Sequence, residues 1–154
     1  MTFPTLGYHD DSSLPKIEIA RIQLTEAINL FVAEKFLCAI TLAGASEEIL
    51  GRLAFIAGHS STTEAAATAI LELKDKLATL ALSSVTKKSL FRSWNAARNT
   101  VKHHDDSDPD PVAINTCDEA YWMIRRALAN AKLIGLKIRN AQEFENWIIV
   151  NVNL

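Results

Sequence analysis

The spacing of apolar residues is the feature of this sequence that most limits its fold. In one segment after another, apolar residues recur at intervals of three and four, and no segment alternates regularly between apolar and polar residues. Three- and four-residue spacing gathers apolar side chains on one face of an α-helix, whereas a half-buried strand requires alternation. The sequence therefore predicts an all-α protein: a single helical bundle of about five helices plus a short C-terminal helix.

The predicted helices follow one another along nearly the whole chain. They cover approximately residues 15–31, 34–56, 64–80, 86–104 and 111–131, and a short last helix starts at residue 140. The second of them carries two apolar faces, which is typical of a central helix packed on several sides. One face holds Cys38, Leu42, Ala45, Ile49, Leu53 and Ile56, and the other holds Phe36, Ile40 and Ala43.

Polar residues mark where several of these helices should begin. Thr62 or Thr63 is the predicted N-cap of the third helix, because a hydroxyl can accept a hydrogen bond from the first helical turn. Asp110, directly before a proline, is the predicted N-cap of the fifth helix. Asn140 and Glu143 have the spacing of a capping box at the start of the last helix.

Length and charge narrow the functional class. The 154 residues, 49% of them hydrophobic, suffice for one domain spanning residues 1–154, with residues 1–14 as a flexible N-terminal arm. The net charge of −2 gives no global positive field, so a nucleic-acid partner would have to use a local patch. Neither a signal-peptide pattern nor a membrane-length apolar run is present, which predicts a soluble cytoplasmic protein without a membrane partner. Cys38 and Cys117 lack metal-site spacing and are expected to be buried thiols.

The fourth predicted helix carries a local concentration of positive charge. Between Lys87 and His104 there are five basic residues and no acidic one, the basic ones being Lys87, Lys88, Arg92, Arg98 and Lys102. Leu90, Trp94, Ala97 and Val101 form its predicted core-facing stripe. We expect the remaining polar groups on an arc away from Trp94. Asn95, Asn99 and His103 follow one another at four-residue steps and should therefore lie in line along the helix. This arc contains Asn95, Arg98, Asn99, Lys102 and His103.

The stretch "RNTVKH", Arg98 to His103, resembles the signature of the HEPN superfamily, an arginine followed by a polar residue and then, after a few positions, by a histidine. His104 also satisfies the spacing. The resemblance implies a small all-α bundle in which this signature lies late in a helix. It also implies a metal-independent endoribonuclease without cofactors, found among toxins and antiviral effectors, that acts on RNA as a homodimer and is restrained by an antitoxin protein.

The resemblance further implies roles for individual residues. His103 would move protons in an attack by the 2′-hydroxyl of RNA on the adjacent phosphorus, because imidazole titrates near neutral pH. Arg98 would stabilise the charged transition state, and Asn99 would orient the imidazole or bind a phosphate oxygen. Lys102, Asn95 and Arg92 would bind RNA, with Glu47 and His104 in supporting positions.

Several alternatives remain open at the level of sequence. The chain could be a non-catalytic HEPN-like module that binds nucleotides or other proteins. Arg98 could simply pair with an acidic neighbour, while His103 could stabilise the negative end of its helix and His104 could lie at the edge of the core. The segment "HHDDSDPD" offers oxygen and imidazole ligands for a metal ion, but its spacing matches no established metal-binding loop. An acidic, proline-broken connector that caps the next helix explains Asp105 to Pro111 without an ion, so no metal is predicted.

Three further polar residues on the second and fifth helices have predicted environments. Glu47 is expected to be partly buried and to bond to Arg98 or to a helix end, because a buried carboxylate needs a partner. Glu48 and Arg52 have the spacing of an exposed ion pair. Arg125 and Arg126 would extend a basic cleft if they face the fourth helix.

Overall fold

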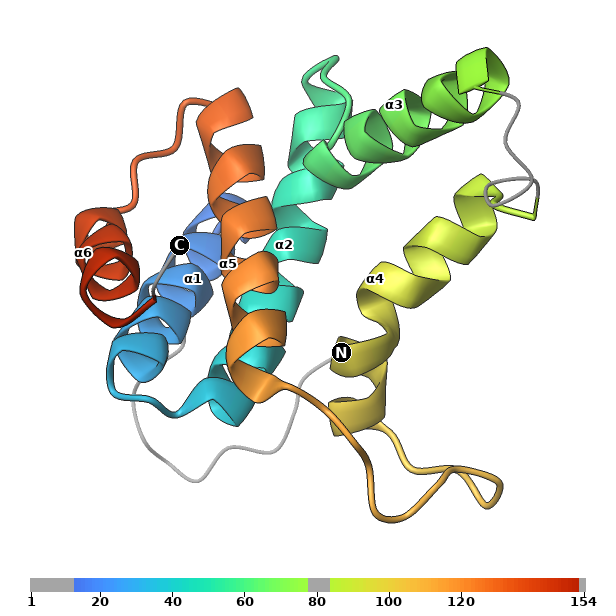
Figure 1. Cartoon of the computed structure of the whole chain (residues 1–154). Helices are drawn as coiled ribbons and strands as arrows, with labels where there is room; N and C mark the ends of the chain where they lie inside the picture. Colours follow the sequence, from blue (N-terminus) through green and yellow to red (C-terminus); the bar gives the residue numbers. More distant parts are fainter. Residues whose placement is uncertain (1–12, 78–83, 153–154) are drawn as a thin grey trace.

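The computed structural model describes residues 13–77 and 84–152, and all regular structure in this part of the chain is helical. The prediction of an all-α bundle is therefore confirmed (Figure 1). Of the predicted N-terminal arm, only Ser13 and Leu14 are described, and both are exposed. The helices are α1 (Lys16–Val32), α2 (Phe36–Ile56), α3 (Thr62–Leu77), α4 (Lys87–Lys102), α5 (Thr116–Leu133) and α6 (Ala141–Asn151).

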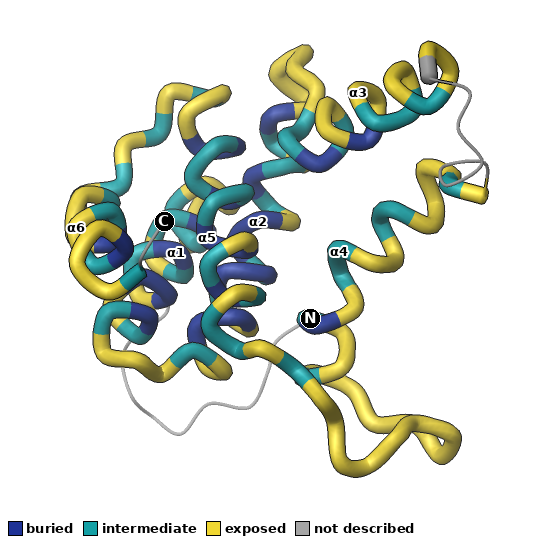
Figure 2. The backbone as a smooth tube through the Cα atoms, in the orientation of Figure 1, coloured by how far each residue is buried: buried dark blue, intermediate teal, exposed yellow. Residues whose placement is uncertain are grey.

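The core lies where α1, α2 and α5 pack side by side, with α6 against α1 (Figures 1 and 2). The apolar residues of α1 that recur at three- and four-residue spacing are buried, except for Ile17 in the first turn, which is exposed. The buried ones are Ala20, Leu24, Ala27, Ile28 and Phe31. Small and aliphatic residues fill most of the space between the helices, and Phe31 and Phe144 are the largest buried side chains. The fully enclosed apolar residues of these helices include Ala20, Leu24, Ile28, Ile40, Leu50, Met123, Ile124 and Ala127.

Helix α2 is central, as predicted, and packs against α1, α5 and α4. Its two apolar faces are not equally covered, however. The face with Ile40 and Ala43 is buried and continues through Glu47 and Leu50. The other face is only partly covered, and Cys38 and Ile56 at its two ends are exposed. The prediction of a buried thiol at position 38 was therefore wrong, because no helix of the described chain covers the α2 surface at this point.

Two predicted N-caps were misplaced. Helix α3 begins at Thr62, and the hydroxyl of Ser61 accepts the hydrogen bond from the amide three residues later, so neither Thr62 nor Thr63 is the cap. Helix α5 begins after Asn115, whose side chain caps it, rather than at Asp110. Residues 102–113 are all exposed. Since helices in proteins depend on packing, this segment has no buried contact to hold it in a helix.

The predicted capping box of α6 does not form. Asn140 is the N-cap residue of α6 but makes no side-chain cap bond with the helix. Its Nδ2 instead donates to the carbonyl of Thr25 at 2.9 Å and to Oδ1 of Asn29 at 2.8 Å, both on α1. A buried amide is therefore used to hold the start of α6 on α1 rather than to cap α6.

Helix α4 stands apart from the core and contacts α2 and α3 (Figure 1). It begins as predicted after Thr86, which forms a capping box with Ser89. Within α4 only Ala97 is buried, while the other residues of the predicted core-facing stripe are half-buried. The helix thus leaves much of its surface to solvent (Figure 2). None of the described helices has the length and apolar character needed to cross a membrane.

Candidate functional site

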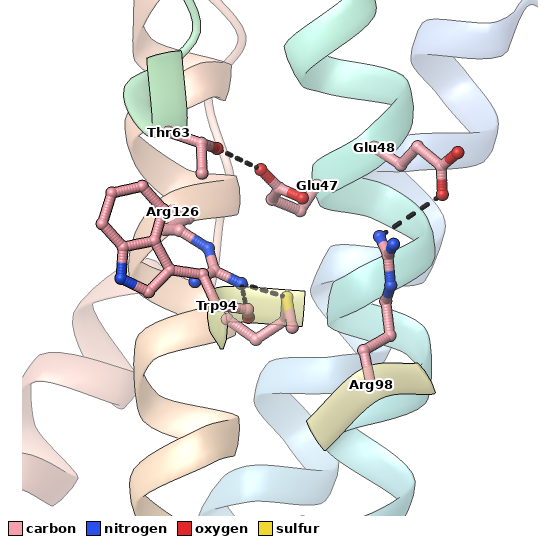
Figure 3. Close-up of polar contacts among 7 residues, drawn as sticks. Glu47, Glu48, Thr63, Trp94, Arg98 and Arg126 are labelled. Atoms are coloured by element: carbon pink, nitrogen blue, oxygen red, sulfur yellow. Dashed lines mark hydrogen bonds and ion pairs between the residues drawn. The ribbon is translucent and has the colours of Figure 1, made fainter. Parts of the chain in front are cut away.

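Arg98 lies on the side of α4 that faces α2, not on the exposed arc where it was predicted. Its side chain is only 15% exposed, and its stem passes over Gly44 of α2. The Nη1 atom donates to Oε2 of Glu48 at 3.4 Å (Figure 3). The position follows from the spacing, because Arg98 comes four residues after Trp94 and so shares its inward direction.

The ion pair between Arg98 and Glu48 is weak. Glu48 keeps 70% of its side chain exposed, and the bond is at the long limit for a hydrogen bond. Exposed pairs of this kind contribute about 0–1 kcal/mol to stability. The Nε atom of Arg98 is enclosed and has no partner in the described part of the chain. The guanidinium is therefore held in place mainly by packing, and another anion could replace Glu48 at little cost.

The predicted pair between Glu48 and Arg52 was wrong, since Glu48 bonds to Arg98 instead. The Arg52 guanidinium lies over the ring of Phe55, 5.1 Å from its centroid. The pattern on α2 alone could not reveal this, because the competing partner comes from α4. The acidic residue of α2 that meets Arg98 is thus Glu48, one position after the predicted Glu47.

His103 does not continue the line of Asn95 and Asn99, because α4 ends one residue earlier. His103 is the C-cap, with extended backbone angles φ −130° and ψ 147°, and its N–H donates to the Asn99 carbonyl at 3.0 Å. His103, His104 and Asn99 are all exposed, so His104 is not at the edge of the core. Within the described chain no hydrogen bond joins either histidine to Arg98.

A groove beside Arg98 is lined by further charged residues. It has a volume of about 440 Å³ and runs between the start of α1, α2 and the end of α4. Lys16, Glu48, Arg52 and Lys102 line it together with apolar residues of α2. Lys102, one of the predicted RNA-binding residues, thus lies in this groove. Lys16 and Arg52 were not among the predicted RNA-binding residues, and the only signal for Arg52 was its place one turn after Glu48.

Arg92 and Asn95, the other predicted RNA-binding residues, lie elsewhere on α4. Arg92 is exposed and borders a shallow hollow on the outer side of α4, together with Lys88 and Ser89. Asn95 is half-buried. The structure therefore separates the predicted RNA-binding residues over two parts of the α4 surface, with Lys102 in the groove and Arg92 outside it.

Glu47 is buried, as the apolar line along α2 predicted, but it does not contact Arg98. It is 7% exposed, and its Oε1 accepts a hydrogen bond from the hydroxyl of Thr63 at 3.0 Å. Thr63 lies in the first turn of α3, so the alternative of a bond at a helix end is the one observed. Glu47 and Glu48 point to opposite sides of α2, one toward α3 and the other toward α4 (Figure 3).

The two arginines of α5 face different neighbours. Arg125 pairs with Glu145 of α6 through two bonds and lies over the ring of Tyr121, away from α4. Burial by itself would lower the pKa of Arg125, but the bonds to Glu145 and Tyr121 raise it above its ordinary value. Arg125 is thus part of the α5–α6 contact and does not extend a basic surface on α4.

Arg126 points toward α4. Its Nη2 donates to the backbone carbonyl of Trp94 at 3.1 Å, and the same atom is 3.1 Å from the sulfur of Met123 (Figure 3). Burial lowers the pKa of Arg126 below its ordinary value; nearby Arg98 lowers it too, while Glu47 opposes the shift. An arginine nevertheless remains charged at neutral pH. Arg126 therefore places a second positive charge behind α4, close to Arg98.

The acidic loop after α4 is organised by its own hydrogen bonds. The N–H of Asp105 donates to Oδ2 of Asp108 at 2.7 Å, and the N–H of Asp108 donates to the carbonyl of Asp105 at 2.9 Å. These bonds close a turn, and they explain the acidic residue at position 108, whose carboxylate accepts one of them, whereas Asp105 takes part only through its backbone. Among the described residues, no group of three or more His, Cys, Asp or Glu side chains is arranged to hold a metal ion.

Comparison with protein-family models, with curated proteins and with solved structures finds no match to this chain. The function therefore has to be inferred from the residues themselves and from their geometry.

Proposed function

We propose that this chain is a metal-independent endoribonuclease of HEPN type that acts as a homodimer. The observation that carries the proposal is Arg98, which is held by packing and bonds to Glu48, a residue that lines a groove together with Lys16, Arg52 and Lys102. Such a groove can bind the phosphates of a single RNA strand, because each lysine or arginine neutralises a phosphate and releases a counterion. The slight overall negative charge makes this local concentration of positive charge more informative.

The proposed reaction uses a nucleophile that RNA itself supplies. A base removes the proton of the 2′-hydroxyl, whose oxygen bonds to the adjacent phosphorus, and an acid protonates the departing 5′-oxygen. The products are a 2′,3′-cyclic phosphate and a free 5′-hydroxyl. Arg98 stabilises the negative charge that develops on the phosphoryl oxygens, exchanging its weak contact with Glu48 for the phosphate. Asn99 is exposed, as His103 is, and in this mechanism it contacts a phosphate oxygen.

Two copies of the chain are needed because one copy offers a single HEPN-type histidine, while the reaction needs a base and an acid at once. The second copy packs at the apolar margin of the groove, on the half-covered face of α2 at Ile49, Leu53 and Ile56, and leaves the basic residues of the groove open to RNA. A two-fold axis here makes the same patch serve on both chains. Each copy contributes its own His103 to a shared site.

The test is cleavage of a single-stranded RNA in the presence of EDTA by the purified chain. Cleavage should continue in EDTA, and the products should carry 2′,3′-cyclic phosphate ends, which a metal-activated water would not produce. His103→Ala should reduce the rate by about a hundredfold or more, the range expected when a general acid or base is removed. Arg98→Ala should be similarly damaging, because it removes charge stabilisation in the transition state.

A matched control is available in His59, which is exposed in the turn after α2 and lies outside the groove. His59→Ala should cleave as fast as the unaltered chain. Cleavage that survives the combined His103→Ala and His104→Ala substitution, or that stops in EDTA, would reject the mechanism.

The non-catalytic reading is favoured by one specific observation: in a single chain Arg98 bonds to Glu48, and His103 lies beyond the end of α4. In that case the groove binds RNA or nucleotides without cleaving them. Overproduction in a bacterial host separates the two functions, because an active ribonuclease slows growth unless an antitoxin is supplied. Harmless overproduction of a folded chain that binds RNA but leaves it intact would establish the binding module.

A further inference from the structure

A second hollow, separate from the groove, lies between α3, α4 and α5. Its volume is about 420 Å³, within the usual range for sites that enclose a small organic group. Trp94 of α4 and Trp122 of α5 form part of its wall, and Trp122 is 59% exposed although it is one of the largest apolar side chains. Two indoles at one cavity offer flat surfaces on which a planar ring can stack.

The cavity also contains one charge of each sign. Glu119, Trp122 and Arg126 lie at three- and four-residue steps on one face of α5, and all three line the cavity. The carboxylate of Glu119 opposes the burial that lowers the pKa of Arg126, yet no ion pair joins the two residues in the described part of the chain. A donor and an acceptor are therefore held apart at one site, where a single ligand can bridge them.

Arg126 is fixed in this position. One nitrogen, Nη2, is anchored on the carbonyl of Trp94 at 3.1 Å, which ties the guanidinium to the same helix that carries one of the indoles. The Nε atom is enclosed and, among the described residues, has no hydrogen-bond partner. Because protein atoms cover Nε and Nη2 is bonded to the Trp94 carbonyl, a ligand in the cavity would meet Arg126 at its other terminal nitrogen, Nη1. The hydroxyls of Thr62 and Ser93 add adaptable polar groups at the rim.

We propose that this cavity binds an unpaired guanine base. Guanine offers the O6 and N7 acceptors that arginine recognises and, on its Watson–Crick edge, N–H donors for a carboxylate. In this arrangement Nη1 of Arg126 donates to O6, Glu119 accepts from the two N–H groups of the Watson–Crick edge, and the ring stacks on Trp122 or Trp94. Adenine fits less well, because its exocyclic amine stands where guanine has O6, facing the arginine.

This inference rests on the proposed function and makes it specific, because the cavity would select which nucleotide lies next to the cleavage site. Trp94 and Arg98 are one helical turn apart on α4, so a base in the cavity and a phosphate at Arg98 lie on neighbouring parts of one helix. A ribonuclease built in this way prefers RNA with an unpaired guanine near the scissile bond.

The test uses fluorescent five-nucleotide RNAs that cannot be cleaved because every 2′-hydroxyl is methylated. Fluorescence anisotropy compares UUGUU with UUAUU. The unaltered chain should bind UUGUU about tenfold or more tightly than UUAUU, as expected for one bidentate base contact. Glu119→Gln should abolish this preference, and Trp122→Ala should weaken the binding of both RNAs by loss of stacking.

Matched controls lie one position away on α5. Asp118→Asn should keep the preference, because Asp118 is exposed and does not line the cavity. Arg126→Lys should reduce the preference, whereas Arg125→Lys should not, since Arg125 faces α6. The thermal unfolding of each variant identifies any that fail to fold, and exposed Trp122 gives a variant that does not depend on core packing.

Failure of the cavity and failure of the proposed function give different results. Equal binding of UUGUU and UUAUU by the unaltered chain, or a guanine preference that persists in Glu119→Gln, would overturn the guanine site while leaving RNA binding intact. If neither RNA binds, a thermal-shift titration with guanosine tests the cavity alone. Stabilisation by guanosine that is lost in Glu119→Gln would support the guanine site and reject RNA as its source, whereas no stabilisation would overturn the site as well.

Discussion

At the scale of single residues, the contact between Arg98 and Gly44 decides how α4 meets α2. A Cβ atom added to Gly44 would lie 2.5 Å from Cδ and 2.8 Å from Cγ of Arg98, closer than carbon atoms can approach. The three atoms nearest to that position all belong to the side chain of Arg98. Gly44 thus leaves the space that the stem of Arg98 fills. This one contact explains why a glycine, which weakens a helix locally, stands at position 44.

This contact predicts that substitutions at the two positions are strongly coupled. Gly44→Ala should lower the free energy of unfolding of the unaltered chain, because the middle of the Arg98 stem has to move. In an Arg98→Ala background the same change should raise it by about 1 kcal/mol, the usual gain of helix propensity from glycine to alanine. Urea unfolding of the four proteins gives the coupling energy. Gly51→Ala, which has no contact with Arg98, is the control and should be additive with Arg98→Ala.

The two cysteines should differ in reactivity, with Cys38 the faster. Cys38 is exposed, whereas burial raises the pKa of the Cys117 thiol, and nearby Asp118 and Glu34 raise it further. A raised pKa leaves less thiolate at neutral pH, and thiolate is the reactive form. Labelling with a disulfide reagent should therefore show a fast and a slow thiol, and the slow one should require more alkaline pH. Retention of the fast phase in Cys38→Ser would contradict this assignment.

At the scale of elements, α6 is held to the core by aromatic contacts. The ring of Phe31 on α1 meets Phe144 at 5.0 Å between centroids and Trp147 at 4.9 Å, both edge to face. Phe36 at the start of α2 also contacts Trp147. Together with the bonds from Asn140 to α1, this cluster makes a short helix part of the bundle. The short C-terminal helix is therefore packed against the bundle as an integral part of it.

The cluster predicts a large difference between two apolar residues of α6. Phe144 is fully buried, so Phe144→Ala should reduce the free energy of unfolding by about 3–5 kcal/mol through lost burial and a cavity. Ile149 on the same helix is 76% exposed, and Ile149→Ala should change the free energy of unfolding by no more than about 0.5 kcal/mol. Chemical denaturation of both variants measures the difference. Similar losses for the two would mean that α6 is not packed in this way.

At the scale of the whole molecule, the bundle consists of a packed core and of helix α4, which carries most of the candidate catalytic and RNA-binding residues. The buried core lies between helices α1, α2, α5 and α6, while α4 contacts α2 and α3 (Figure 1). The cavity at Arg126 and the groove at Glu48 both border this helix, the cavity at Ser93 and Trp94 and the groove at Lys102. A helix with few buried residues can combine both sites because its surface is not needed for the core.

The partly covered face of α2 predicts that a substitution there which prevents two copies from associating should also stop RNA cleavage. Ile56 lines the groove and is 68% exposed, so Ile56→Asp should leave the monomer folded while it disrupts association of two copies. Light scattering at micromolar concentration should show a dimer for the unaltered chain and a monomer for Ile56→Asp. Ile149→Asp, an equally exposed apolar position on α6, should remain a dimer. A strict monomer in the unaltered chain would count against the shared site.

The sequence by itself determined the helices and most of the core. The spacing of Ala20, Leu24 and Phe31 repeats with the period of a helix, and burial follows because local geometry alone places these side chains on one face. The capping residue Thr86 was predictable for the same reason, since its bonds are to residues within three positions. The buried state of Glu47 also followed from its place on an apolar line of α2.

Only the tertiary structure decided which polar groups meet. Glu48 could pair with Arg52 along α2 or with Arg98 from α4, and the choice depends on where α4 packs, which no pattern within one helix specifies. The same holds for Arg125 and Arg126: neighbours in sequence, they point to α6 and to α4 because adjacent helical residues are about 100° apart. Residues near in the chain are placed by helix geometry, whereas partners far apart in the chain are chosen by packing.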